Sequence, residues 1–386
     1  MKKVLIASTA LVAATMLSAG AASASEKIKL NLGGYSKWWV VAAQQDSSFQ
    51  ANANTAGAQA DYNTVDIKGD NEIFFGGSTT LDNGLKVGID IQLEAGGHTD
   101  QTTDTIDESY IWIEGGFGKF IVGSENNGTY LLHVTAPDAA GNWNEGGIMT
   151  GGFSLAVPTN VRGVDPTSNG NNTTAIVTDN DAEKITYVAP SFYGLTVGAS
   201  YVPSAAGQDN RSTVDINTQT TGEIFGAGAL YANTFGGVGV KVSAGAVFYD
   251  LNSKTVGGAK DDVQEYAAGT QLSYAGFTLG GSYRQVVAST GTTTLDNNAS
   301  AWDIGLQYAS GPYAVSAAYF KSSAEGTRAT VGEDEIEFYQ VSGKYTLGAG
   351  VDALASVGYA SYEDETNSVQ NENKGWVVMT GLSLAF

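Results

Sequence analysis

LKVGIDIQLE, residues 85–94, alternates apolar and polar side chains from end to end. Side chains on a β-strand point alternately to its two faces, so one face of this segment is wholly apolar and the other is charged, polar or tiny. The apolar row holds Leu85, Val87, Ile89, Ile91 and Leu93, and the polar row holds Lys86, Gly88, Asp90, Gln92 and Glu94. A strand of a soluble β-sandwich could show this pattern too, so the decisive point is how many segments repeat it.

The same alternation returns along the rest of the chain, for example in 238–248, 277–283, 302–308, 313–319 and 339–345. Aromatic side chains recur near the ends of the apolar rows, as the interfacial girdles of a membrane barrel require. We predict sixteen strands, at 27–42, 61–81, 85–97, 106–116, 118–125, 182–190, 194–204, 222–234, 237–250, 263–275, 276–288, 299–310, 312–324, 334–347, 350–362 and 374–386. With an even number, the first and last strands can pair and remove the sheet edges, and this many strands leave a water-filled interior.

Two kinds of connection alternate between the predicted strands. Tight connections contain Gly or Asn-Gly, as short hairpins require; examples are Asp82-Asn83-Gly84, Gly116-Phe117 and Ser310-Gly311. Long connections are polar and rich in acids or Asn. Short turns on one side and long loops on the other are typical of outer-membrane barrels. The predicted fold is therefore all-β, a sixteen-stranded antiparallel transmembrane β-barrel.

Residues 126–181 interrupt the alternation and form the third long connection, after 43–60 and 98–105. The acids of this segment are Asp138, Glu145, Asp165, Asp179 and Asp181, and Arg162 is its one cationic side chain. Structureless connections longer than about 15 residues are uncommon in compact domains unless they are functional or disordered. A floppy surface loop is the plain alternative. The position of the segment in the strand order favours a gate.

The N-terminus has the layout of a secretory signal peptide, which we predict at 1–24. A basic start, Met1-Lys2-Lys3, precedes the apolar run 4–17 and the small-x-small cleavage site Ala22-Ser23-Ala24. The apolar run is too short for a spanning helix, which needs about 20 apolar residues. We expect the mature chain to begin at Ser25 and residues 25–386 to form one barrel domain.

Composition and charge limit the possible functions. The chain has 50 Gly, 19 Tyr and no Cys, which suits strands and turns, and a net charge of −21 leaves no basic surface for nucleic acid. Acidity this strong favours cations over anions. The predicted lumen-facing cations are few: Lys29, Lys37, Lys68, Lys86, Lys184, Lys241, Arg284 and Lys344. Asp90 and Glu94 share their face.

The motifs predict no cofactor and no catalytic centre. His98 and His133 lack partners at the spacing that a catalytic triad or a zinc site needs. The acidic clusters 179–181 and 333–335 offer hard oxygen ligands that could bind divalent cations. Solvated loop acids are the simpler interpretation of both clusters.

The stretches 69–75, 81–87, 116–119 and 184–195 lie in order along the chain, and 382–386 stand at its end. Together these stretches resemble the general diffusion porins of Gram-negative outer membranes, most closely the alphaproteobacterial type. Gly381, Leu384 and Phe386 fit the family's terminal insertion signal, whereas Met379 stands where a polar residue is usual. The arginine that the family often has near the start of the fifth strand is not evident, and Ser124 and Glu125 occupy that region.

The resemblance implies an outer-membrane homotrimer, surrounded by lipid and lipopolysaccharide and inserted by the barrel-assembly machinery. It also implies that the third long loop folds into the lumen and forms a constriction, which would carry Asp138, Glu145, Arg162 and Asp165. We expect a non-enzymatic, water-filled porin for passive diffusion of ions and small hydrophilic solutes, with a preference for cations. The alternatives are a substrate-specific sugar or amino-acid channel, a barrel enzyme, and a structural or adhesive barrel with an occluded lumen.

Overall fold

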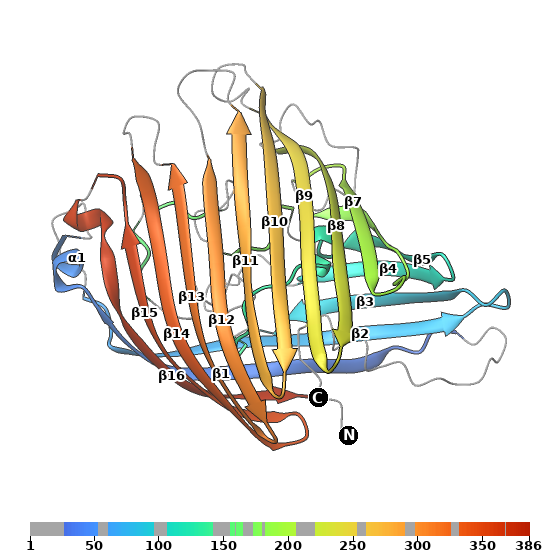
Figure 1. The fold of residues 1–386 in the computed structure, drawn as a ribbon, viewed down its shortest axis with the longest axis horizontal. Coiled ribbons are helices and arrows are strands. Elements are labelled where there is room, and N and C mark those ends of the chain that lie inside the picture. Colours follow the sequence, from blue (N-terminus) through green and yellow to red (C-terminus); the bar gives the residue numbers. More distant parts are fainter. Residues whose placement is uncertain are drawn as a thin grey trace.

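Sixteen β-strands form one closed antiparallel barrel in the computed structural model (Figure 1). The structure describes residues 27–52, 61–95, 106–141, 155–158, 160–164, 173–179, 182–205, 221–252, 260–289, 298–325, 332–366 and 368–386. The strands are β1 (Asn31–Gln45), β2 (Val65–Thr80), β3 (Lys86–Glu94), β4 (Glu108–Gly115), β5 (Gly118–Ser124), β6 (Glu183–Val188), β7 (Leu195–Val202), β8 (Thr221–Phe235), β9 (Val238–Asn252), β10 (Lys260–Tyr274), β11 (Phe277–Ser289), β12 (Ala299–Ser310), β13 (Tyr313–Glu325), β14 (Glu333–Gly348), β15 (Val351–Glu363) and β16 (Asn373–Ala385). Each strand pairs with its sequence neighbours, and β1 pairs with β16 to close the ring.

The predicted number and order of the strands are confirmed. The largest differences are at the starts of β1 and β2, which we predicted at 27 and 61 and which begin at Asn31 and Val65. A strand begins where a neighbouring strand supplies hydrogen-bond partners, and the alternation of side chains does not mark that point. The predicted signal peptide, 1–24, lies outside the described residues.

The two faces of the barrel wall differ as the alternation predicts. On β1, Trp38 is 45% exposed on the outside, whereas its neighbour Trp39 is 3% exposed on the inside. Residues paired across strands share a face, so Lys68 and Gly381, the partners of Trp39, also face inward. The exposed row of aliphatic and aromatic side chains continues around the ring and gives the wall the apolar exterior that a lipid bilayer requires.

Tight turns join the strands at one end of the barrel. In the turn between β2 and β3, Leu81 N donates to Leu85 O (2.8 Å), and the Asn83 side chain accepts from Leu85 N (3.1 Å). Gly84 has a φ of +84°, a left-handed conformation that favours glycine. The connections at the other end include α1 (Ser47–Asn52) and η5 (Val369–Asn371). Within the described part of the chain, no helix is both long and apolar enough to cross a membrane.

The main apolar core lies inside the barrel. Val161, Val164 and Ile176, from the long segment 126–181, are each at most 1% exposed and belong to one cluster with inward-facing side chains of the wall. The larger wall members of this cluster are Trp39, Val41, Val202, Ile224, Val247, Tyr249, Val263, Val286, Phe320, Ile336, Phe338, Leu354, Tyr362, Val377 and Met379. Much of the inner wall at the end of the barrel with the long connections is therefore packed against the segment and does not face water.

Candidate functional site: the lumen and segment 126–181

Segment 126–181 begins with the short helix α2 (Gly128–Leu131), whose cap joins the two ends of the segment. Asn127 caps the helix, because its Oδ1 accepts from the backbone N–H of Thr129 (2.8 Å). The Asn127 amide also donates to the carbonyl oxygen of Ile176 (3.0 Å) and to Oδ1 of Asp179 (2.5 Å). This buried side chain therefore holds the start and the end of the segment together.

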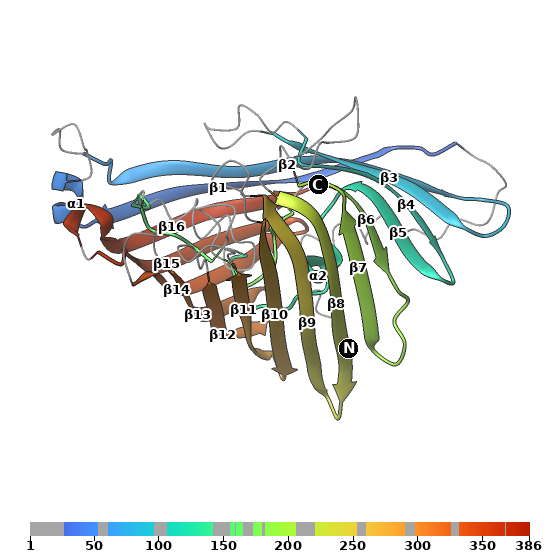
Figure 2. The same cartoon turned by 90° about the horizontal axis from the view of Figure 1, so that it is seen from above.

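The outgoing limb, residues 128–141, runs along the inner wall, and Figure 2 shows α2 within the ring of strands. Backbone N–H groups of this limb donate to inward-facing side chains of β7, β9, β12 and β13: Gly128 to Ser200 Oγ (2.7 Å), Val134 to Ser243 Oγ (3.0 Å), Ala136 to Asp303 Oδ1 (3.0 Å) and Ala139 to Ser316 Oγ (2.8 Å). A buried backbone N–H without an acceptor costs free energy, and the limb does not pair with a neighbouring strand that could supply acceptors. Polar side chains of the wall supply the acceptors instead.

Glycines on the inner face allow the outgoing limb to approach the wall closely. A Cβ at Gly269 on β10 would lie 1.7 Å from the carbonyl oxygen of Val134. A Cβ at Gly228 on β8 would lie 2.9 Å from Cα of Thr129. A larger residue at either position would push the limb away from the wall.

The middle of the segment contacts β14, β16 and β1. The N–H of Ala156 donates to Gln45 Oε1 (2.8 Å), and its carbonyl oxygen accepts from Asn373 Nδ2 (2.7 Å). The N–H of Arg162 donates to Asp334 Oδ2 (2.9 Å), and its guanidinium donates to the backbone carbonyl at the end of β13 (3.2 Å). The structure thus places Arg162, a predicted constriction residue, against the wall.

The returning limb, residues 173–179, lies over β10, β11 and β12. Thr174 Oγ1 donates to Asp303 Oδ2 (3.0 Å), while the other oxygen of that carboxylate accepts from the outgoing limb. Thr174 Oγ1 is also 2.6 Å from Ser282 Oγ on β11. Both limbs therefore meet on one buried carboxylate of β12.

Two of the predicted lumen cations lie on the inner wall but are sealed beneath the segment. The Lys184 side chain is 0% exposed and lies 3.5 Å from Asp179, and Nζ donates to the Glu125 carbonyl oxygen. Burial raises the pKa of Asp179, and the Lys184 ammonium opposes that rise. Arg284 is also 0% exposed and pairs with Glu265 at 2.5 Å. These two cations balance buried acids instead of facing water.

Predicted wall residues on β1, β2 and β3 stay partly exposed. Their contacts are Lys37 with Asp70 (3.2 Å), Lys68 with Asp66 (2.9 Å) and Asp90 with Trp112 Nε1 (2.8 Å). Lys86 and Glu94 lie on the same inner face of β3. Of the other predicted wall cations, Lys241 lies on the inner face of β9, and Lys344 lies 3.9 Å from Asp352 near the tight turns.

Acids outnumber bases on the inner face of β1–β5. The register places seven acids there, Asp66, Asp70, Glu72, Asp90, Glu94, Glu108 and Glu114, and four lysines, Lys37, Lys68, Lys86 and Lys119. The formal charge of this face is therefore −3 (4 − 7).

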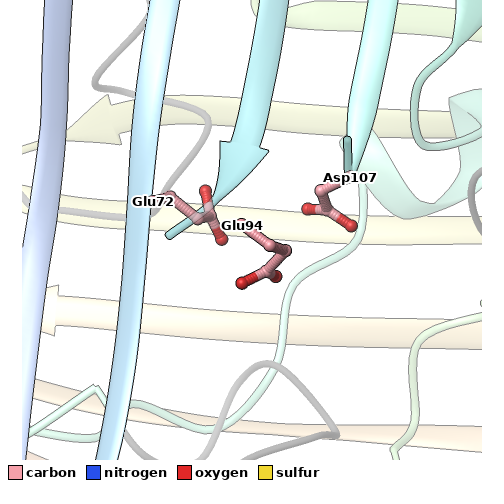
Figure 3. Close-up of side chains that lie close together, drawn as sticks. All are labelled: Glu72, Glu94 and Asp107. Carbon is pink, nitrogen blue, oxygen red and sulfur yellow. The ribbon is translucent and has the colours of Figure 1, made fainter. Parts of the chain in front are cut away.

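Three carboxylates gather on this side of the lumen, those of Glu72 on β2, Glu94 on β3 and Asp107 just before β4 (Figure 3). One oxygen from each lies within 4.8 Å of the others. The Tyr35 hydroxyl donates to Glu72 (2.5 Å). Glu94 was predicted to face the lumen. Glu72 has the same parity as Lys68, so the alternation could have identified it, whereas Asp107 lies in a connection, where alternation gives no direction.

The remaining predicted residues fall in different places. Asp138 accepts from Ser316 Oγ (3.0 Å) on the inner wall, while Glu145 and Asp165 lie outside the described residues. Of the two acidic clusters considered for divalent ions, 179–181 includes the buried, paired Asp179, and 333–335 includes Glu335, 3.0 Å from Lys321. His133 lies with Nε2 3.4 Å from Thr174 Oγ1, and His98 lies outside the described residues.

The residues of the predicted assembly signal lie at the seam of the barrel. A Cβ at Gly381 would lie 2.2 Å from the Trp38 carbonyl oxygen, so the position requires glycine. Leu384 and Phe386 are 41% and 64% exposed on the outside.

A closed barrel of sixteen antiparallel strands, apolar outside and lined by polar and charged groups along part of its interior, has the architecture of an outer-membrane channel protein. The chain belongs to the Gram-negative porin family, whose model matches residues 7–365. The predicted family and the predicted outer-membrane location are thereby confirmed, while the alphaproteobacterial type remains a prediction.

The chain is similar to a curated relative and to solved porin structures. It is 30% identical over 124 residues to a major outer membrane protein of Pasteurella multocida, a match that spans 32% of each chain and so about a third of that relative. It superposes on an anion-selective porin from Comamonas acidovorans with a TM-score of 0.60, 16% identity and coverage of 93% of this chain and 100% of that one. It also superposes on the outer membrane channel DcaP of Acinetobacter baumannii with a TM-score of 0.61 and 15% identity, and the match covers 94% of this chain and 99% of that one. At these identities the structural matches show the fold alone.

Proposed function

We propose that this chain forms a water-filled outer-membrane channel for passive diffusion of ions and small hydrophilic solutes. The observation that carries the proposal is the path of segment 126–181, whose described residues line the inner wall of a closed barrel. Irregular backbone is tolerated at membrane depth where it is buried in protein or lines a water-filled cavity. The segment narrows the passage, and its many contacts with the wall support a fixed constriction more than a swinging gate.

We further propose that the channel prefers cations. The inner face of β1–β5 has seven acids against four lysines, and the sealed Arg284 and Lys184 each pair with an acid. Fixed negative charge along a narrow passage raises the local concentration of cations and lowers that of anions. Asp138 on the outgoing limb adds to this charge.

The proposed assembly is a homotrimer in lipid and lipopolysaccharide. One solved structure similar to this chain is described as the trimer form of OmpT from Vibrio cholerae. The seam formed by β1 and β16 supports a role of the barrel-assembly machinery in insertion, because Leu384 near the end of β16 and Phe386, which follows the strand, are exposed. We propose that no resident cofactor takes part.

A channel is favoured over an enzyme by the family and by the fold. The catalytic alternative requires His98 or His133, and His133 is packed between the limbs of the segment beside Thr174. A solute-specific channel would differ from a general one in its conductance, which would saturate as one solute is added.

Single-channel recording in planar bilayers under a salt gradient tests the proposed function. We expect stepwise conductance, a reversal potential on the cation-selective side and higher conductance when part of 126–181 is deleted. The absence of any conductance would contradict the channel. A deletion variant that folds but keeps the native conductance and reversal potential would place the constriction elsewhere.

A further inference from the structure

Arg284 and Glu265 form a buried ion pair where the returning limb meets the wall. Arg284 Nη2 and Nε lie 2.5 Å and 3.0 Å from Glu265 Oε2, and neither side chain is exposed. The pair bridges the adjacent strands β10 and β11, and the Tyr249 hydroxyl donates to Glu265 Oε1 (2.8 Å) from β9. A buried ion pair needs such additional hydrogen bonds to offset the desolvation of its two charges.

The other hydrogen bonds of the pair go to the returning limb. Arg284 Nη1 donates to the carbonyl oxygens of Thr173 (3.3 Å) and Ala175 (2.9 Å). Thr178 Oγ1 donates to Glu265 Oε1 and accepts from Arg284 Nη2 (3.4 Å). The limb and the ion pair therefore supply each other's hydrogen-bond partners. The limb gains donors for two buried carbonyl oxygens, and the pair gains partners for its polar atoms.

We propose that Arg284 and Glu265 form a clasp that fixes the returning limb (173–179) against the wall and thereby sets the open width of the channel. The inference rests on the proposed channel function. Both are positioning residues, because neither faces water and each acts on permeation through the limb. A clasped limb gives a steady open-channel current, and a released limb moves and produces a fluctuating one.

Removing both charges together tests the clasp without leaving one buried charge unpaired. In the double variant Glu265→Leu, Arg284→Met the limb loses its donors, while the hydrogen-bond ladder of the wall is unchanged. We expect the barrel to assemble and the open-channel current noise to rise several-fold over that of the native chain. The matched control is Lys344→Met, Asp352→Leu, which removes an inner-wall pair on β14 and β15 and should leave the noise at the native level.

A reversible cross-link can replace the clasp, because the native chain has no Cys. Thr174 Oγ1 on the limb and Ser282 Oγ on β11 are 2.6 Å apart, so sulfur atoms in their places can reach bonding distance. The double variant that also carries Thr174→Cys and Ser282→Cys should show native noise when oxidised. Reduction should restore the fluctuating current. A merely structural loss of barrel stability would not follow the redox state in this way.

Native-like noise in the double variant, or noise that oxidation does not remove, would overturn the clasp. If the double variant does not assemble, Thr178→Val decides, since it removes only the hydroxyl between the limb and the pair. Increased noise in that variant supports the clasp, and native noise overturns it. A native chain without conductance would contradict the channel function itself, so the two failures are distinguishable.

Discussion

Ile89 and Gln92 lie on the same strand, β3, and face opposite sides of the barrel wall. Ile89 pairs with Ile111, which is 57% exposed on the outside, whereas Gln92 pairs with the inward-facing Glu108. A lysine at Ile89 would meet lipid, which costs about 2–4 kcal/mol near the midplane of the bilayer. We expect Ile89→Lys to lower the folding yield in lipid vesicles and Gln92→Lys to leave it unchanged. Equal yields would show that the register of β3 is wrong.

His133 should make the packing of the segment sensitive to pH. Burial, and secondarily the Arg284 guanidinium, lower the pKa of His133 from 6.5 to about 4. A released imidazole would take up a proton near pH 6.5, so between pH 6.5 and about 4 the packed state binds fewer protons than the released state. The stability of the packed state is therefore complete above this window and falls as the pH drops through it.

Acidification from neutral pH to about pH 4 should thus increase the open-channel noise of the native chain. His133→Asn, which cannot take up this proton, should weaken the response, and single-channel recording at stepped pH measures both. An unchanged pH response in the variant would assign the effect to other titrating groups.

Single-residue roles on the wall were only partly predictable. Parity correctly placed Lys184 and Arg284 on the inner face, but it could not show that the segment covers them. Whether another segment covers a wall side chain depends on contacts between residues far apart in the chain. The alternation pattern shows only which face of the wall the side chain lies on. The same limit hid the role of Asp303, whose two oxygens hold both limbs.

At the scale of elements, the strands were predictable from the alternation, whereas the place of the segment inside the barrel followed only from the family resemblance and its contacts were not predictable. Strands leave a local signal of period two, and tight turns leave glycine at left-handed positions such as Gly84. The segment has no period, because its backbone bonds to wall side chains over separations of 109 residues for Val134 with Ser243 and 177 for Ala139 with Ser316. Its existence was visible as a break in the alternation, but its contacts were not.

The seam between β1 and β16 depends on the last residue of the chain. Gly34 N donates to Phe386 O and Phe386 N donates to Gly34 O, both at 3.1 Å, so Phe386 completes the ladder that closes the ring. Its exposed ring also extends the outer apolar row. We expect a chain that lacks Phe386 to assemble more slowly in cells, as measured by pulse-labelling of heat-resistant barrels. Unchanged outer-membrane levels and rates would count against this role.

On the scale of the whole molecule, the inner wall of the barrel has an apolar part that packs against the segment and a charged part. Apolar side chains from β7 to β16 and β1 pack with the segment into a dry core, whereas the inner face of β2–β5 keeps charged side chains such as Asp90 and Lys119. The strong net charge of the sequence predicted a preference for cations but not where the acids would act. The structure concentrates acids on the inner face of β2–β4, where all but Glu108 stay partly or fully exposed.

Wall acids should therefore control ion preference even in concentrated salt. Glu72→Gln with Glu94→Gln removes two of the three carboxyl groups that gather within the lumen, where bulk salt screens less than at an open surface with its Debye length of about 8 Å at physiological ionic strength. We expect the reversal potential under a salt gradient to shift toward zero at both low and high salt. The control, Glu333→Gln with Glu335→Gln, changes acids on the outer face at the end of β14, and its effect should disappear at high salt. If the two double variants respond alike at high salt, the selective field does not arise from the β2–β4 wall, and the acids of segment 126–181 become the next residues to neutralise.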